Sequence, residues 1–380
     1  MRRVLVTAAL LAVPLAGCSE GGDGPGPTTV TAPTAEESAT DPGSSAEGST
    51  LGRDRPVAVV DTVVTGMEAP WGLGFLPDGR AVVTERDTRA VLLVDPEGGE
   101  PRQVGVLGDP VAEGEAGEGG LLGVAVSPDF ARDRLLYFYL STPEDNRIVR
   151  APLDRKDVLG TPEVLLDGIP TGFIHDGGRL RFGPDGLLFA STGEAGTPDL
   201  AQDRSSLGGK ILRITPDGEP APGNPDPDSP VWTWGHRNVQ GLAFDDDGNL
   251  WASEFGQSTY DELNLVRGGL NYGWPTVEGR GDEEGLVNPR VVWDTSQASP
   301  SGLAYAEGHL WLGALQGTRL WRVTVADGEA SAPTGFFVGE YGRLRTVEVA
   351  PDGRLWVTTS NRDGRGSPAP EDDRILVVAP

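Results

Sequence analysis

The chain has 380 residues and a formal net charge of −26, from 31 Lys and Arg against 57 Asp and Glu. This excess of acidic side chains argues against nucleic acid or an anionic lipid surface as a partner, and any anion-binding site must gather its few basic residues in one place. The 55 Gly and 32 Pro favour a chain of many turns over a helical protein. The single Cys rules out an intrachain disulfide framework and a Cys-cluster zinc site.

The first seventeen residues have the pattern of a secretory signal. Arg2 and Arg3 precede an apolar run, Val4 to Leu15, that is too short to cross a bilayer. The run leads into Leu-Ala-Gly-Cys, which resembles the lipobox of bacterial lipoprotein precursors, where the Cys is acylated and begins the mature protein. We therefore predict a lipoprotein signal peptide over 1–17 and a lipid anchor on Cys18. The protein would then lie outside the cytoplasm, attached to the cell membrane through lipid alone. The alternative is an ordinary signal peptide.

Residues 18–55 are predicted to form a disordered tether. Between Ser19 and Thr50 there is no aromatic residue, and Val30 is the only apolar side chain larger than Ala or Pro. Gly, Pro, Ser, Thr and Glu fill most of the rest. Such a segment cannot bury enough apolar area to offset the entropy of ordering it. The folded domain is therefore expected over 56–380.

The folded part repeats one pattern six times: a short apolar strand, a tight turn and a second strand. Pro-Asp-Gly and Asp-Asp-Gly favour turns because Pro presets φ, Asp bonds its own backbone and Gly accepts a positive φ. Six copies over 325 residues (380 − 55) take about 54 residues each, which is typical of a four-stranded propeller blade. We predict an all-β, six-bladed β-propeller, or seven blades if one copy has lost its turn signal. The turn residues are Gly79, Phe130, Gly186, Gly248, Gly308 and Gly353.

Polar residues gather at two positions of the repeat. One lies six to eight residues after the turn and the other ten to twelve residues before it. Because the strands that enter and leave a turn are antiparallel neighbours, both sets fall at the end of the blades away from the turns, where propellers bind ligands over the axis. A single polar residue at a strand end is more often simply solvated, but the two rings together indicate a site. They contain Glu85, Arg86, Glu194, Glu254, Gln316 and Asn361, then Glu118, His175, His236, Arg237, Asn238, Gln297 and Arg343.

One histidine is a candidate base. His175 precedes Gly177 and Gly178, which allow the backbone to approach a ligand closely, although a lone His is more often structural. His309 directly follows the turn residue Gly308, so it belongs to the opposite face and has no predicted role. The chain has no phosphate loop, no nucleophile elbow and no His-Glu-x-x-His motif. Its abundant oxygen ligands suit a hard cation such as Ca²⁺.

Several sequence blocks follow one another in a specific order. They include GEGGLLGVAVSPDF, HDGGRLRFGPDGLLFASTGEAG, LGGKILRITPDG, GHRNVQGLAF, GGLNYGWP and TTSNRDGRG. Together, over nearly all of residues 60–380, the chain resembles the soluble aldose or glucose/sorbosone dehydrogenases that depend on pyrroloquinoline quinone (PQQ). The resemblance implies a six-bladed propeller that oxidises aldoses at the C1 hydroxyl to lactones, with PQQ and Ca²⁺ as cofactors and an external quinone or cytochrome as electron acceptor.

The resemblance also implies roles by position. His175 would take the sugar hydroxyl proton as the hydride passes to the quinone, and Glu194 would orient this base. Arg237 would stabilise negative charge that develops on the quinone. Arg343 and Arg345 would bind cofactor carboxylates. Asn238 and Gln240 would contact cofactor or substrate, Glu118 would lie beside the sugar, and the backbone oxygens of Gly256 and Gln257 would hold the calcium that polarises the quinone.

The chain departs from the family pattern at three of these positions. Glu194 replaces a usual Asp, Gln257 a usual Pro at the calcium site, and Gln316 a Lys that binds the cofactor in some members. Two other functions stay open. One is a metal-dependent lactonase of the six-bladed kind, with Glu85, Asn238 and Glu254 as ligands. The other is a non-catalytic propeller that binds ligands at the cell surface.

Overall fold

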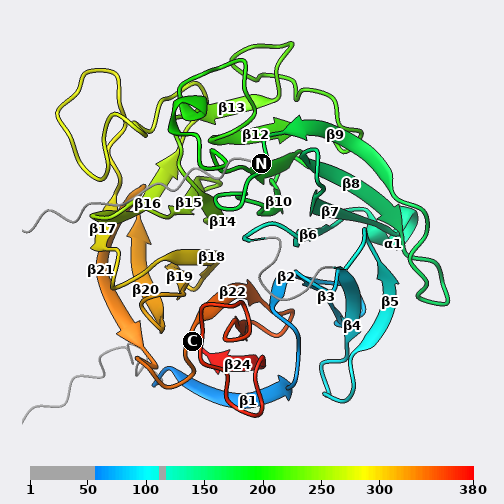
Figure 1. Cartoon of the computed structure of the whole chain (residues 1–380). Coiled ribbons are helices and arrows are strands. Elements are labelled where there is room, and N and C mark those ends of the chain that lie inside the picture. Colours follow the sequence, from blue (N-terminus) through cyan, green and yellow to red (C-terminus); the bar gives the residue numbers. More distant parts are fainter. Residues whose placement is uncertain (1–55, 111–116) are drawn as a thin grey trace, which may run out of the picture. The chain divides into compact units, whose positions relative to one another are not determined.

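The computed structural model describes residues 56–110 and 117–380, which form six four-stranded antiparallel sheets around a central axis (Figure 1). The predicted six-bladed, all-β propeller is confirmed, and a seventh blade is absent from these residues. Their helical elements are short: α1 (Phe130–Asp133) and the 3-10 helix η1 (Pro198–Ala201). The predicted signal peptide (1–17), tether (18–55) and lipidation site (Cys18) lie outside the described residues. No helix within the described ranges is long and apolar enough to span a bilayer.

Five blades each use four consecutive strands, with the first strand of each blade innermost. The first two blades are β2 (Pro70–Phe75), β3 (Ala81–Glu85), β4 (Ala90–Val94) and β5 (Arg102–Val106), then β6 (Leu121–Val126), β7 (Leu135–Ser141), β8 (Asn146–Pro152) and β9 (Glu163–Ile169). The third and fourth are β10 (Leu180–Phe182), β11 (Leu188–Ser191), β12 (Lys210–Ile214) and β13 (Val231–Trp234), then β14 (Val239–Phe244), β15 (Leu250–Glu254), β16 (Tyr260–Val266) and β17 (Val291–Asp294). The fifth is β18 (Pro300–Ala306), β19 (His309–Ala314), β20 (Arg319–Ala326) and β21 (Glu329–Phe336).

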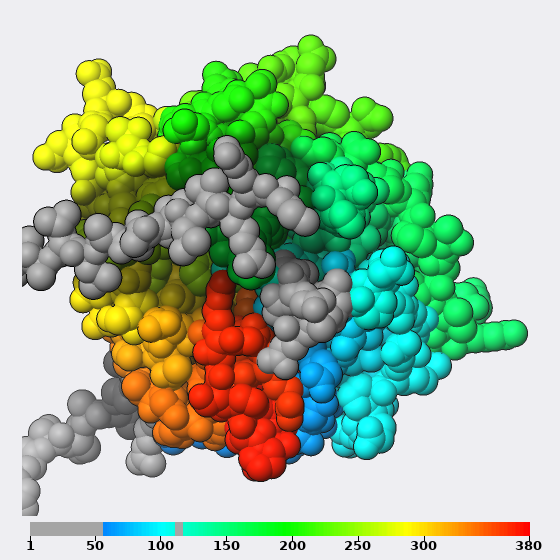
Figure 2. Space-filling model, in the orientation of Figure 1, coloured from blue at the N-terminus to red at the C-terminus, as the bar shows by residue number. Residues whose placement is uncertain are grey.

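The sixth blade closes the ring with strands from both ends of the described chain. It consists of β22 (Leu344–Val349), β23 (Leu355–Thr359) and β24 (Ile375–Ala379), with β1 (Ala58–Val64) as its outermost strand. The C-terminal part of this blade, in red, lies between the fifth blade, in orange, and the first, in cyan, while β1 is blue (Figure 2). β1 pairs antiparallel with β24 between Ala58 and Val64, so the first and last strands of the described chain lie side by side in one sheet.

The turns between the first two strands of each blade obey the local chemistry expected from the sequence. At five of them the predicted glycine has a positive φ, from 76° to 92°. In the second blade, which lacks the glycine, Phe130 begins α1 and Arg134 takes the left-handed conformation with φ 55°. Gly is preferred at such positions because it has no Cβ to clash with the backbone.

The cores lie between blades. Val82 and Leu93 of the first blade, for example, share one buried cluster with Leu136 and Phe138 of the second. Neither blade could bury this apolar area alone, which is why the copies must stack.

Glycines on the inner strands allow neighbouring blades to approach each other closely. A Cβ on Gly72 would lie 2.7 Å from the carbonyl oxygen of Leu122 in the next blade. In the third blade the corresponding position holds Arg179, whose guanidinium lies 4.3 Å from the centre of the Trp71 ring and donates to the carbonyl oxygen of Gln240. Burial lowers the pKa of Arg179 to about 9. Arg179 thus joins the inner strands of the first, third and fourth blades.

Candidate active site

A cavity lies over the axis, at the end of the propeller away from the turns that join the first two strands of each blade. All six blades contribute to its wall. Most of the predicted site residues lie in the wall. Glu194 lies behind the wall. Gln257, the next residue in the chain after the wall residue Gly256, has an exposed side chain. The wall consists of Arg86, Glu118, His175, Arg237, Asn238, Gln240, Phe255, Gly256, Ser299, Leu315, Gln316, Arg343, Arg345, Asp363 and Arg365.

The wall is basic although the chain is strongly acidic. It holds five arginines against the two carboxylates of Glu118 and Asp363. A cluster of guanidinium groups in a cavity favours a ligand with several carboxylates, because each guanidinium can bind a carboxylate through two parallel hydrogen bonds. The site is thus suited to an anion that the rest of the surface would repel.

His175 is held from three directions. Its Nδ1 lies 2.7 Å from Glu194 Oε1, its backbone N–H donates to Glu118 Oε2 at 2.9 Å, and its carbonyl oxygen accepts from the amide of Ala195 at 3.1 Å. The residue has a φ of 64°, a strained conformation for a non-glycine residue that is typical of functional sites. Since Nδ1 is occupied by the buried Glu194, Nε2 is the ring nitrogen left for a ligand in the cavity.

His236 occupies the same register in the next blade but cannot act in the same way. Its Nδ1 lies 2.8 Å from Glu254 Oε2, so the His–Glu pair of the third blade is repeated in the fourth. Its Nε2, however, lies 2.9 Å from the hydroxyl of Thr233, and its ring stacks on Tyr272 and has no exposed surface. With both nitrogens bonded inside the protein, His236 is structural.

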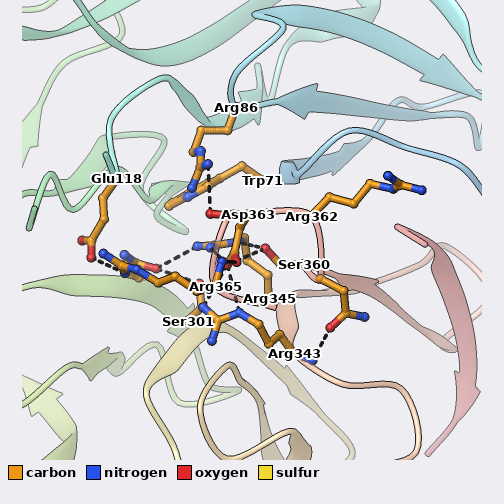
Figure 3. Close-up of polar contacts among 12 residues, drawn as sticks. Trp71, Arg86, Glu118, Ser301, Arg343, Arg345, Ser360, Arg362, Asp363 and Arg365 are labelled. Carbon is orange, nitrogen blue, oxygen red and sulfur yellow. Dashed lines mark hydrogen bonds and ion pairs between the residues drawn. The ribbon is translucent and has the colours of Figure 1, made fainter. Parts of the chain in front are cut away.

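Glu118 links His175 to the opposite side of the cavity. Its Oε2 accepts from the backbone of His175 and, at 3.4 Å, from Asn238 Nδ2, while its Oε1 accepts from Arg365 Nη1 at 2.6 Å (Figure 3). Burial raises the pKa of Glu118, but the charge of Arg365 and the amide of His175 outweigh it and hold this pKa below its ordinary value. Glu118 is therefore an ionised acceptor beside the candidate base.

Asp363 organises two of the predicted cofactor ligands. Its Oδ2 accepts from Arg343 Nη2 at 2.9 Å and from Arg345 Nη2 at 3.1 Å (Figure 3). Arg345 also donates from Nε to Ser360 Oγ and from Nη1 to Gln240 Oε1. Burial lowers the pKa of Arg345 to about 10. Burial would raise the pKa of Asp363, but the two arginines hold it below its ordinary value. The network fixes both guanidinium groups before any ligand binds.

Arg237 is the least satisfied arginine of the wall. Within the described residues its Nη1 makes one long hydrogen bond, 3.4 Å to the carbonyl oxygen of Phe255, and its buried Nε has no partner. The guanidinium carbon lies 5.5 Å from the centre of the Trp274 ring. Burial lowers the pKa of Arg237. A half-buried cation with so few hydrogen bonds is poised for an anionic ligand.

A family profile described as Glucose / Sorbosone dehydrogenase matches residues 67–369 of the chain. The chain belongs to the glucose/sorbosone dehydrogenase family. The family resemblance seen in the sequence blocks is thereby confirmed.

Relatives of this glucose/sorbosone dehydrogenase include enzymes and solved structures. The aldose sugar dehydrogenase YliI of Escherichia coli is 31% identical over 349 residues, which cover 80% of this chain and 91% of the relative. Quinoprotein glucose dehydrogenase B of Acinetobacter calcoaceticus is 33% identical over 258 residues, which cover 59% of this chain and 54% of the relative. The PQQ-bound structure of aldose sugar dehydrogenase from Streptomyces coelicolor is 53% identical, with a TM-score of 0.81 over 85% of this chain and 97% of that one.

Glu194 and Gln316, two of the residues that depart from the family pattern, both lie at the site, and Gly256 precedes the third, Gln257. Glu194 reaches His175 despite replacing a shorter Asp. Gln316 lies in the wall with its side chain exposed. Gly256, expected to bind calcium, lies in the wall and donates its N–H to Asp261 Oδ1 at 2.9 Å.

The ligand set considered for a lactonase does not assemble. Glu85 accepts from the backbone of Glu68 and from Thr88, and Glu254 accepts from His236 and the backbone of Arg237. No group of three or more His, Cys, Asp or Glu residues in the described chain could hold a metal ion. A calcium site made of backbone carbonyls does not depend on such a group.

The sequence did not single out five of the wall residues, and it predicted others that lie elsewhere. The five are Phe255, Ser299, Leu315, Asp363 and Arg365. Arg86 stood in a polar ring but received no role, and Asp363 and Arg365 were not identified, although both belong to the TTSNRDGRG block that carried the resemblance. That block was the signal for them. Six members of the predicted rings are outside the wall: Glu85, Glu194, His236, Glu254, Gln297 and Asn361.

Proposed function

We propose that this protein oxidises aldose sugars at the C1 hydroxyl to lactones, with PQQ and Ca²⁺ as cofactors. The observation that carries the proposal is His175, fixed through Nδ1 by Glu194 and facing a cavity lined by five arginines. The names of the relatives, quinoprotein glucose dehydrogenase and aldose sugar dehydrogenase, support it. The electrons would pass on to an external quinone or cytochrome.

The residues of the cavity fit both cofactors. PQQ carries carboxylates, and Arg343 and Arg345 are the groups that would hold them. Arg237, whose Nε is unbonded in the described structure, would stabilise negative charge on the quinone. Calcium prefers hard oxygen ligands such as the backbone carbonyls of Gly256 and Gln257. When bound, PQQ would supply the hydride acceptor and Ca²⁺ would polarise its carbonyl as a Lewis acid.

The chain's own residues would move the proton. His175 Nε2 takes the proton of the C1 hydroxyl while a hydride leaves C1, and the sugar becomes the lactone. Glu194 keeps the proton of the neutral imidazole on Nδ1 and stabilises the imidazolium that forms, as an acidic residue does for a catalytic His in other sites. Arg237 would provide positive charge where negative charge accumulates.

Reconstitution tests this proposal. The protein supplied with PQQ and Ca²⁺ should develop the absorbance of reduced PQQ when an aldose is added, and each cofactor should raise the affinity of the other by the same factor. A chelator should remove activity, and renewed Ca²⁺ should restore it. Full activity in excess chelator, or without quinone, would refute the proposal. A lactonase would need only metal, and a binding module would turn over nothing. A panel of aldoses in the same assay identifies the substrate.

We also propose that Cys18 anchors the protein to the membrane. The support is the lipobox-like sequence, and two or more acyl chains give stable attachment where one would be marginal. Cys18→Ser should move the protein from the membrane fraction to the soluble fraction while the melting temperature of the propeller stays the same. Mass spectrometry of the wild type should find an acylated Cys18 at the N-terminus. An unmodified mature protein that begins at another residue would show that the proposal is wrong.

A further inference from the structure

The loop that carries the expected calcium ligands is bound from outside the cavity by one carboxylate. Glu278 Oε1 accepts hydrogen bonds from four successive backbone N–H groups, those of residues 257–260, at 2.7, 2.9, 2.9 and 3.2 Å. Glu278 comes from the segment between β16 and β17, about twenty residues further along the chain. Four donors on a single oxygen show that the loop is folded around this carboxylate.

The direction of these bonds fixes the direction of the carbonyl groups. In a trans peptide the N–H and C=O of one peptide unit point to opposite sides. The N–H of Gln257 shares its peptide unit with the carbonyl of Gly256, and the N–H of Ser258 shares its unit with the carbonyl of Gln257. Since both N–H groups point to Glu278, the carbonyl oxygens of Gly256 and Gln257 point away from it. These are the two oxygens expected to bind calcium.

A second carboxylate fixes the same loop to the neighbouring blade. Asp261 Oδ1 accepts from Gly256 N–H at 2.9 Å, and its Oδ2 accepts from Ser299 N–H at 2.5 Å. Gly256 and Ser299 both lie in the cavity wall. A Cβ on Gly256 would overlap the carbonyl oxygen of Tyr260, so only glycine fits where the loop folds back on itself. The loop is therefore tightly closed, and little of its geometry is left to adjust.

We propose that Glu278 is a positioning residue for the calcium site, one that aims the carbonyls of Gly256 and Gln257 and increases their electron density through the shared peptide units. This inference rests on the proposed function. It also explains a departure of the chain from its family. The usual Pro at position 257 has no N–H, whereas Gln257 makes the shortest of the four bonds to Glu278. In this chain the hydrogen bonds to Glu278 restrain the loop, as the ring of Pro at position 257 would in other members of the family.

Calcium affinity, measured by calorimetry on the full protein with PQQ present, tests the proposal. Outer residues that orient metal ligands typically contribute ~10–100-fold in affinity, so Glu278→Ala should weaken Ca²⁺ binding by at least ~10-fold. Glu278→Gln keeps an oxygen acceptor and should give an intermediate loss. Glu284 is an exposed acidic residue on the same segment. Glu284→Ala removes the same charge as Glu278→Ala and should leave the affinity for Ca²⁺ unchanged. Equal losses for Glu278→Gln and Glu278→Ala would mean that only charge matters, which would overturn the positioning role.

A reciprocal substitution gives a second readout. Gln257→Pro should weaken Ca²⁺ binding in the wild type, because it removes the 2.7 Å bond to Glu278, but strengthen it in Glu278→Ala, where a fixed φ restrains the loop. The same sign in both backgrounds would contradict the proposal. If Glu278→Ala does not fold, the Ca²⁺ affinity of Glu278→Gln alone tests the inference. A Ca²⁺ affinity of Glu278→Gln equal to that of the wild type would overturn it. A wild type that binds no Ca²⁺ would instead refute the proposed function.

Discussion

Replacing His175 by Asn should lower kcat by at least ~10²-fold while the melting temperature and PQQ binding change little. A general base contributes typically ~10²–10⁴-fold, and an Asn amide can donate to Glu194 but cannot accept the sugar's proton. Asn also tolerates the positive φ of this position. The hydrogen bonds of the His175 backbone to Glu118 and Ala195 survive the substitution. Steady-state kinetics, thermal melting and PQQ titration measure the three quantities.

His175→Ala is a less clean variant, because it leaves the buried carboxylate of Glu194 without the bond to Nδ1. Glu194 Oε2 already has no partner in the described structure, so Ala at 175 should reduce turnover as Asn does and also lower the melting temperature. His309→Asn, at the turn end of β19, is the matched control and should not change the rate. Near-wild-type turnover of His175→Asn with bound cofactor would show that the mechanism is wrong, and unfolding of this variant would make His175 a structural residue.

Glu194→Asp is the informative companion. The 2.7 Å contact of Glu194 Oε1 with Nδ1 requires the longer side chain in this backbone. Shortening it should alter kcat and the pH profile of kcat/KM, in either direction. A profile that coincides with that of the wild type would mean that Glu194 does not act through His175.

Replacing Arg345 by Lys should weaken PQQ binding by roughly 30-fold or more, since breaking a buried, hydrogen-bonded charge pair costs about 2 kcal/mol or more. Arg345 donates from all three nitrogens, to Ser360, Gln240 and Asp363, and a single ammonium cannot reproduce this planar arrangement. The loss also frees Asp363 to draw Arg343 away from the ligand. Fluorescence titration with PQQ at saturating Ca²⁺ measures the dissociation constant.

Arg362→Lys is the control for this experiment. Arg362 comes from the same loop as Asp363, but its guanidinium points away from the cluster and donates to the backbone of Asp372 (Figure 3). The substitution preserves charge in the same way and should leave PQQ affinity unchanged. Equal affinities for the wild type and Arg345→Lys would mean that Arg345 does not bind the cofactor.

The sequence determined the architecture because its signals are local. Each Pro-Asp-Gly or Asp-Asp-Gly turn acts over three or four residues, and its repetition at similar intervals is enough to count blades. The same register predicted that His175, Arg237 and Arg343 share one mouth, since equivalent positions of a repeat must lie on the same face. The family resemblance then added roles that register alone could not supply.

The tertiary structure decided the rest, because those features depend on contacts between distant segments. His175 and His236 occupy the same register, and each is paired with a Glu. Only the contacts of His236 with Thr233 and Tyr272 show that its ring is not available to a ligand. The ion pair of Glu118 with Arg365 joins residues 247 positions apart, and the bond of Arg345 to Gln240 spans 105. No local pattern encodes such distances. They follow from ring closure, which brings the loop before the second blade, the fourth blade and the sixth blade together around one axis.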